Sequence, residues 1–257
     1  MGMYIGIGRK ARQCFGFDEI ALVPSSLTIN PDEVDPSWEL GGRRFEVPLI
    51  ASAMDGVVDV DFAIAMGKLG GLAVLNLEGV QTRFADAGEM LDRIASASPE
   101  ESTHLIQTVY GEPIKKELIG KRVEQIKAGG APAVVSAIPQ RAGEFGPVAA
   151  EAGCDIFVVQ STVATINHES SAYDTLDFAA FIAEMHRREV PVIVGNTCTY
   201  QVTYELMEAG ADAILVGIGP GAACTTRGVL GIGIPQVTTT VDTAYARDRF
   251  YKMTGRY

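Results

Sequence analysis

The chain has 257 residues, and its 21 Lys and Arg against 32 Asp and Glu give a formal net charge of −11. With 47% hydrophobic and 21% charged residues, its composition is that of a globular protein and argues against disorder. An acidic chain repels phosphate backbones, so nucleic acid is not an expected partner.

The sequence also fits poorly with a membrane protein or a disulfide-stabilised protein. The longest apolar runs, such as 213–218, fall far short of the roughly 20 residues that span a bilayer. The four cysteines (Cys14, Cys154, Cys198 and Cys224) show neither a CxxC pair nor zinc-ligand spacing. We therefore expect a cytoplasmic protein with reduced thiols and no membrane partner.

The first 46 residues show no sustained hydrophobic period. They contain three prolines and a Gly41–Gly42 pair, and 18–24 (DEIALVP) is a candidate short strand. We interpret residues 1–46 as an N-terminal arm that packs on the main domain.

From residue 47 onward, apolar runs alternate with helical patterns. The runs, each predicted to be a strand, begin near residues 48, 71, 132, 155, 191 and 213. Helices are predicted over 59–69, 82–97, 113–127, 141–152, 176–188, 200–209 and 237–252, with a polar stretch at 98–103 between the second and third. Because the strands are apolar throughout and alternate with helices, we expect a parallel sheet buried on both faces. Ala152-Gly-Cys-Asp155 and Ala209-Gly-Ala-Asp212 form a faint repeat that places a helix-stopping glycine before a strand.

An α/β barrel is the favoured architecture. The competing doubly wound sheet usually has a glycine-rich turn after its first strand, and Asp55-Gly-Val-Val-Asp59 is not that fingerprint. A complete (β/α)8 TIM barrel needs eight strands, so residues 47–257 are predicted to form an incomplete barrel with about six βα units. We accordingly expect that Tyr257 is a truncation, a proteolytic end or the limit of the ordered chain, and that this piece is inactive alone.

The connection after the sixth predicted strand carries the chemistry. It reads Gly217-Ile-Gly-Pro-Gly-Ala-Ala-Cys-Thr-Thr-Arg227, followed by Gly228-Val-Leu-Gly-Ile-Gly-Ile-Pro-Gln236. Loops after barrel strands form the catalytic face, and so many glycines indicate close backbone approach to a ligand. Cys224 is either a nucleophile whose pKa Arg227 lowers or a buried cysteine in a tight turn, and composition does not separate the two.

This loop resembles the catalytic loop of the inosine-monophosphate dehydrogenase and GMP reductase family, G-x-G-P-G-S-x-C-T-T-R with a following G-x-G-x-P-Q. Phe17-Asp-Glu-Ile-Ala-Leu-Val-Pro24, Ser52-Ala-Met-Asp55 and Val192-Ile-Val-Gly-Asn-Thr197 are similar to other segments of that family. The resemblance covers most of the chain and is weak between residues 80 and 150.

The resemblance implies an NADP- or NAD-dependent oxidoreductase that acts at C2 of a purine mononucleotide, GMP or IMP, through a covalent thioimidate. Cys224 would be the nucleophile and Thr226 would help activate water or ammonia. Substrate contacts would come from Ser52, Met54, Gly221 and Ala222. Cofactor contacts would come from Gln160, Ser161, Asn196, Gly217, Ile218 and Gly219. The backbone carbonyls of Gly219, Gly221 and Cys224 would hold a potassium ion, and the resemblance implies a homotetramer or larger homo-oligomer.

Three positions depart from the family pattern. Ala222 replaces a serine whose hydroxyl contacts phosphate, Gln160 replaces an aspartate that contacts the cofactor, and Leu215 replaces a basic residue. No stretch between residues 76 and 130 is long enough for the paired regulatory modules of many dehydrogenases, which favours a reductase or a divergent dehydrogenase-related subfamily. The preferred reaction is NADPH-dependent reduction of GMP to IMP. The alternatives are an NAD-dependent IMP dehydrogenase and a catalytically weakened, nucleotide-binding regulatory relative.

Overall fold

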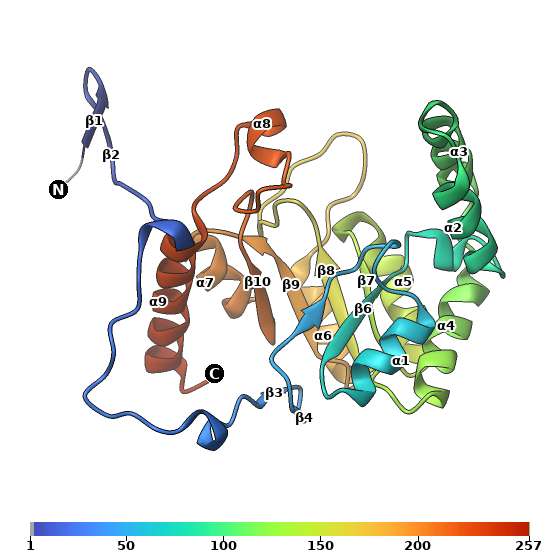
Figure 1. Ribbon diagram of the computed structural model, residues 1–257, viewed down its shortest axis with the longest axis horizontal. Coiled ribbons are helices and arrows are strands. Elements are labelled where there is room, and N and C mark those ends of the chain that lie inside the picture. Colours follow the sequence, from blue (N-terminus) through green and yellow to red (C-terminus); the bar gives the residue numbers. More distant parts are fainter. Residues whose placement is uncertain (1–2, 257) are drawn as a thin grey trace.

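A curled parallel sheet forms the centre of the molecule (Figure 1), whose computed structural model describes residues 3–256. Six strands pair in chain order: β5 (Ile50–Ala51), β6 (Leu72–Asn76), β7 (Val134–Ala137), β8 (Ile156–Gln160), β9 (Val192–Thr197) and β10 (Ala213–Val216). A doubly wound sheet would reverse its strand order part-way, and this one does not. The predicted six βα units of a TIM barrel are confirmed, with β5 and β10 as the two edge strands.

Helices cover the outer face of this sheet and extend beyond it. Their bounds are α1 (Val60–Lys68), α2 (Ala87–Ser96), α3 (Pro99–Gly111), α4 (Lys116–Ala128), α5 (Pro139–Glu151), α6 (Phe178–Arg187), α7 (Tyr200–Glu208), α8 (Thr226–Leu230) and α9 (Gln236–Thr254). Each predicted helix is present, although the one predicted to start at Thr82 begins at Ala87 after a 3-10 turn, Val80–Thr82.

The polar stretch at 98–103 forms the first turns of α3, a helix that the sequence did not predict. Ser98 is the N-cap, and its Oγ accepts the Glu101 N–H at 3.3 Å. Pro99 occupies the first turn, where its missing N–H costs nothing. The local signals for this helix start were therefore present in the sequence.

Residues 3–46 hold two small hairpins that the sequence did not predict. They are β1 (Met3–Gly6) with β2 (Arg9–Ala11), and β3 (Trp38–Leu40) with β4 (Arg43–Phe45). Between them lie 3-10 turns at Phe17–Glu19 and Pro31–Glu33. The strand predicted over 18–24 is wrong, because this segment has no neighbouring strand to pair with and is irregular after the first turn.

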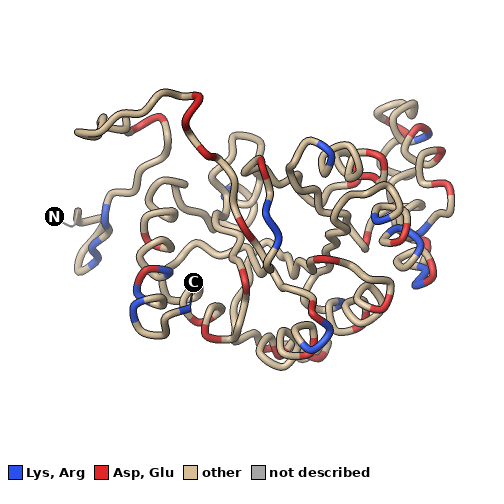
Figure 2. Tube along the Cα trace, turned by 90° about the horizontal axis from the view of Figure 1, so that it is seen from below, with Lys and Arg blue, Asp and Glu red and all other residues tan. Residues whose placement is uncertain are grey.

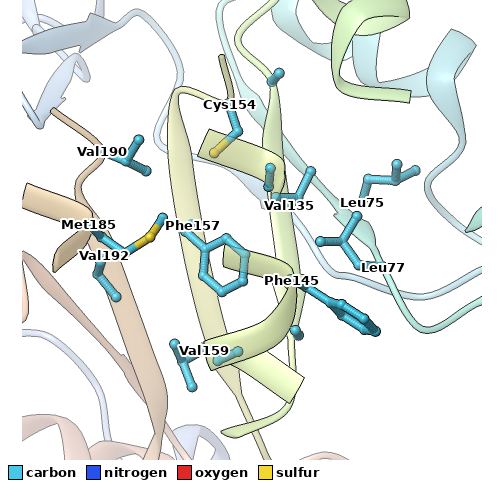
Figure 3. Packing of buried hydrophobic residues seen from close by; sticks show 14 of the residues in the cluster. Leu75, Leu77, Val135, Phe145, Cys154, Phe157, Val159, Met185, Val190 and Val192 are labelled. Atoms are coloured by element: carbon cyan, nitrogen blue, oxygen red, sulfur yellow. The ribbon is translucent and has the colours of Figure 1, made fainter. Parts of the chain in front are cut away.

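Two apolar cores lie on opposite faces of the sheet. Side chains alternate along each strand, so Phe157 and Val159 of β8 join the core between sheet and helices (Figure 3), whereas Ile156 and Val158 join the core inside the barrel. Each strand therefore serves two cores, which explains why the sequence shows continuous apolar runs instead of alternation.

The β3–β4 hairpin supplies part of the inner core. Leu40 and Phe45 are buried there against the strands. Arg43 of this hairpin and Lys127 of α4 both form ion pairs with Asp155, whose side chain is only 5% exposed. Asp155 precedes β8, so a buried carboxylate ties the hairpin to the amino-terminal end of the barrel.

The faint repeat at 152–155 and 209–212 forms the same helix-to-strand connection twice. Gly153 and Gly210 have φ values of +84° and +105°, which end the preceding helices. Asp155 Oδ2 accepts the Ala133 N–H at 2.8 Å, and Asp212 Oδ2 accepts the Val192 N–H at 2.7 Å. Each aspartate thus fixes the start of its own strand to the start of the preceding one.

Charged residues of both signs are interspersed along the helices and loops, as Figure 2 shows from below. Among residues 3–256, no helix is long and apolar enough to cross a membrane.

Candidate active site

A glycine-rich loop at the carboxyl end of β10 carries Cys224. Its entry is fixed by Gly217, whose N–H donates to the Thr197 carbonyl at 2.8 Å. The Ile234 N–H donates to the Ile218 carbonyl at 3.1 Å, and Gln236 Nε2 donates to the Val216 carbonyl at 3.3 Å. The two ends of the loop are thereby tied together, while its centre projects from the sheet edge (Figure 1).

The Arg227 side chain is the reason that two positions of this loop must be glycine. Gly219 has φ +70°, and a Cβ there would lie 2.7 Å from Arg227 Cγ. A Cβ at Gly233 would lie 2.4 Å from the same atom. The aliphatic part of Arg227 therefore fills the space between the two glycine backbones, where only glycine fits.

Cys224 is exposed, so the alternative of a buried cysteine in a tight turn is wrong. Its Sγ lies 3.3 Å from Thr226 Oγ1. The Thr226 hydroxyl, followed by the backbone amides of Thr226 and Gly219, lowers the pKa of Cys224, because these donors stabilise the thiolate; desolvation opposes them. Arg227 is not among these causes, so its predicted role in lowering this pKa is wrong.

The other thiols behave differently. Burial raises the pKa of Cys154 to about 12 and also raises the pKa of the half-buried Cys198. Since the thiolate is the nucleophile, Cys224 combines exposure with a lowered pKa that neither of these two has.

Three of the residues predicted to contact a cofactor meet beside this loop. Asn196 Nδ2 donates to the Gly217 carbonyl at 3.2 Å, and the Asn196 N–H donates to the Ser161 carbonyl at 3.0 Å. Asn196 Oδ1 is buried without a partner among the described residues. Gln160 is the last residue of β8, and the backbone from Gly217 through Ile218 to Gly219 is buried.

The residues predicted to contact substrate come from both edge strands. Ser52 and Met54 are exposed and follow β5 directly, whereas Gly221 and Ala222 are exposed in the Cys224 loop after β10. All six strands are parallel, so both groups lie at the carboxyl end of the sheet. This is the end where barrel enzymes build their sites.

The predicted potassium ligands are backbone carbonyls in the same loop. The Gly221 carbonyl already accepts the Cys224 N–H at 3.1 Å. A carbonyl oxygen carries two lone pairs, so this bond leaves one of them free for a cation. No cluster of three or more His, Cys, Asp or Glu side chains that could hold a metal ion occurs within residues 3–256.

Sequence reasoning missed two carboxylates at this end of the sheet. Glu78, two residues after β6, accepts the Ile138 N–H at 2.8 Å, and burial raises its pKa against the opposing effects of that bond and of nearby arginines. Asp55, directly after Met54, has a buried Oδ1 with no partner in the described part of the chain. The available signal was a charged residue directly after a predicted strand. His168, in the loop after β8, is exposed and has its Nε2 2.9 Å from the Tyr173 hydroxyl.

Comparison with known proteins decides the family. The IMP dehydrogenase / GMP reductase domain matches residues 14–253. The chain belongs to this family.

Its relatives include proteins with and without an assigned reaction. An uncharacterized oxidoreductase of Mycolicibacterium smegmatis is 36% identical over 98% of this chain and 68% of its own length. The inosine-5'-monophosphate dehydrogenase of Cryptosporidium parvum is 32% identical over 86% of this chain and 56% of its own. An IMP dehydrogenase/GMP reductase-like protein from Corynebacterium glutamicum superposes with a TM-score of 0.90 at 31% identity, over 99% of this chain and 67% of that one. The chain is thus an oxidoreductase of the IMP dehydrogenase / GMP reductase family.

Proposed function

We propose that Cys224 attacks C2 of a purine mononucleotide and that the reaction is the NADPH-dependent reduction of GMP to IMP. The observation that carries the proposal is the exposed Cys224 thiol, whose pKa is lowered, on the glycine loop at the carboxyl end of the sheet. The names of the relatives, oxidoreductase and inosine-5'-monophosphate dehydrogenase, support the same class of reaction.

The residues of the loop act on the thiol and on the nucleotide. The Thr226 hydroxyl donates to the Cys224 thiolate and keeps it available for attack. The sulfur adds to C2, the C2–N2 bond breaks, and the amino group takes up a proton and leaves as ammonia, which produces a thioimidate on Cys224. Ser52 and Met54 hold the nucleotide from the β5 side, and Gly221 and Ala222 hold it from the β10 side.

Asn196 is suited to a nicotinamide carboxamide, because its buried Oδ1 lacks a donor among the described residues. Gln160, Ser161 and the 217–219 backbone would complete that site, and the carbonyls of Gly219, Gly221 and Cys224 would hold a potassium ion. A nicotinamide cofactor would supply, when bound, a hydride to C2; the C2–S bond then breaks and returns the Cys224 thiolate, so that overall GMP, NADPH and two protons give IMP, NADP⁺ and ammonium.

The segment between β6 and β7 favours reduction over dehydrogenation. It holds the α2–α3 pair and α4, and no room is left there for a pair of regulatory modules. The same proposal includes a cytoplasmic homotetramer, and light scattering of the purified protein tests its size.

The deciding experiment compares two assays, GMP with NADPH and IMP with NAD, on a chain extended past Tyr257 to eight barrel strands, by the absorbance of the reduced nicotinamide. We expect turnover with GMP and NADPH, no turnover for Cys224→Ser, and little change for Cys198→Ser. GMP should also protect Cys224 from thiol labelling. Turnover only with IMP and NAD would show a dehydrogenase, and nucleotide protection without turnover in either assay would show a binding relative.

A further inference from the structure

The α2–α3 pair is a satellite unit on the side of the barrel. Val80, Ala87 and Val109 form a small core of their own with apolar neighbours from the two helices. Figure 1 shows the pair standing away from the sheet, inserted between β6 and α4. Its apolar contacts are therefore largely internal, so its position depends on polar contacts at its base.

One of these contacts reaches the loop that carries Ser52 and Met54. Tyr110, in the last turn of α3, donates its hydroxyl to Asp55 Oδ2. The same oxygen accepts the Val80 N–H at 2.8 Å. Asp55 follows Met54 directly, so a side chain from the satellite unit holds the residue next to a proposed substrate contact.

The surroundings of Asp55 leave its carboxylate little freedom. A Cβ at Gly79 would lie 1.8 Å from Asp55 Oδ1, so the carboxylate occupies the space that a side chain there would need. The Arg83 guanidinium lies 5.7 Å from the Tyr110 ring centroid and bonds the carbonyls of Glu78 and Glu112. Burial, and then the bond to Asp55, raise the pKa of Tyr110, so its hydroxyl keeps its proton and remains a donor at neutral pH.

The other side of the loop is fixed by the barrel. The Met54 carbonyl accepts the N–H groups of Val57 and Val58, both at 2.9 Å, and Val58 is buried. The turn from Ser52 to Val58 is thus held by the core at one end and by Tyr110 at Asp55. Ser52 and Met54, which precede Asp55 in this turn, are exposed.

We propose that Tyr110 is a positioning residue: through Asp55, the α2–α3 unit holds the 52–58 turn in the conformation that binds the purine mononucleotide. This inference rests on the proposed function, because it assigns the turn to that substrate. The coupling is reciprocal, so nucleotide bound at the turn must also hold α3 more firmly on the barrel.

The test is Tyr110→Phe, which removes one hydroxyl and keeps the ring. We expect GMP to bind about 3- to 10-fold more weakly by calorimetry, the loss of one hydroxyl-to-carboxylate bond at a half-exposed position. KM for GMP, measured on the chain extended past Tyr257, should rise by the same factor with kcat little changed. Asp55→Asn should weaken binding in the same direction, and the double variant should bind no more weakly than the weaker single variant.

Hydrogen exchange supplies a signal that a purely structural role would not give. GMP should slow amide exchange in α3 of the wild-type protein, and Tyr110→Phe should abolish that slowing while thermal melting confirms that the variant is folded. Tyr245→Phe is the matched control, because Tyr245 is exposed on α9 and its ring lies 5.7 Å from the Tyr200 ring. Wild-type affinity in Tyr110→Phe, or unchanged exchange in α3 of the wild type, overturns the inference alone. A wild-type protein that binds neither GMP nor IMP overturns the proposed function and this inference with it.

Discussion

Arg122 of α4 fixes the base of the α2–α3 unit and offers a sharp test of how that unit is held. The residue is 6% exposed. Its Nε donates to the Gln81 carbonyl at 2.8 Å, and its Nη2 donates to the Phe84 and Ala85 carbonyls at 2.9 Å. One guanidinium therefore satisfies three carbonyls in the segment that leads into α2.

The substitution Arg122→Met keeps the aliphatic stem and removes the guanidinium. Each lost bond between a charged donor and a carbonyl costs about 1.5–3 kcal/mol. Two effects offset part of that sum. The guanidinium no longer has to be desolvated, a cost that is visible in the lowered pKa of Arg122, and water reaches the exposed Ala85. The net loss of unfolding free energy is therefore expected to be about 2–4 kcal/mol.

Urea unfolding followed by circular dichroism measures this loss, and the midpoint should fall with little change in slope. Arg141→Met is the matched control: Arg141 is half exposed and pairs with Glu144 one turn along α5, so its loss should cost about 0.5 kcal/mol or less. A cost below about 1 kcal/mol for Arg122→Met would refute the reasoning, because it would mean that water replaces the guanidinium without penalty.

Four further substitutions concern the thiol, two glycines of α5 and a buried carboxylate. Thr226→Val should raise the pKa of Cys224 by removing its main hydrogen-bond donor, so the pH profile of iodoacetamide labelling should move to higher pH and labelling at neutral pH should slow. In α5, Gly143→Ala should stabilise by about 0.5–1 kcal/mol, because its Cβ meets nothing within 4 Å. In the same helix, Gly146→Ala should destabilise by about 1–3 kcal/mol, since its Cβ would lie 2.8 Å from the Phe181 ring; thermal melts of both variants provide the check. Asp155→Asn should cost about 1–3 kcal/mol in urea unfolding, because a buried carboxylate loses its charge opposite two half-exposed cations.

Controls for these variants lie close by in the chain. Thr225→Val should leave the labelling profile of Cys224 unchanged, because the Thr225 side chain makes no cap bond. Asp35→Asn removes a carboxylate from an exposed ion pair with Arg44 and should cost less than about 0.5 kcal/mol. An unmoved labelling profile in Thr226→Val, equal melting temperatures for the two glycine variants, or equal costs for the two aspartate variants would each contradict the physical reason given.

The sheet could be predicted because the residue types along each strand show whether both of its faces are buried. A run such as Ile156-Phe157-Val158-Val159 is apolar at every position only if both faces of the strand are covered. The arm was not predictable in the same way, because 18–24 has the composition of a strand but no neighbouring strand. The helix α3 was missed because its first turns are polar, and its apolar residues pack only on the small core that it shares with α2.

The candidate site could likewise be predicted only in part. Glycine density pointed to the Cys224 loop, because only a backbone with special geometry needs so many glycines. The predicted effect of Arg227 on the Cys224 thiol was wrong, because closeness in sequence does not guarantee contact. The Arg227 stem turns back between Gly219 and Gly233, and Thr226 is the residue that lowers the pKa of the thiol. The contact between Tyr110 and Asp55 joins residues 55 positions apart, and no local pattern encodes such a pairing.

The way the Cys224 loop is held explains why its cysteine is exposed and has a lowered pKa. Bonds from Gly217, Ile234 and Gln236 tie the loop's two ends, and the stem of Arg227 fills its base. The segment between these ties cannot fold back onto the apolar core, so Cys224 stays in solvent, where little desolvation opposes its ionisation. The pKa of the thiol is then set mainly by the donors that this backbone aims at it: the Thr226 hydroxyl and the amides of Thr226 and Gly219. It follows that substitutions at Gly219 should disturb the thiol through the backbone, whereas substitutions that shorten Arg227 should loosen the loop first and alter the pKa only as a consequence.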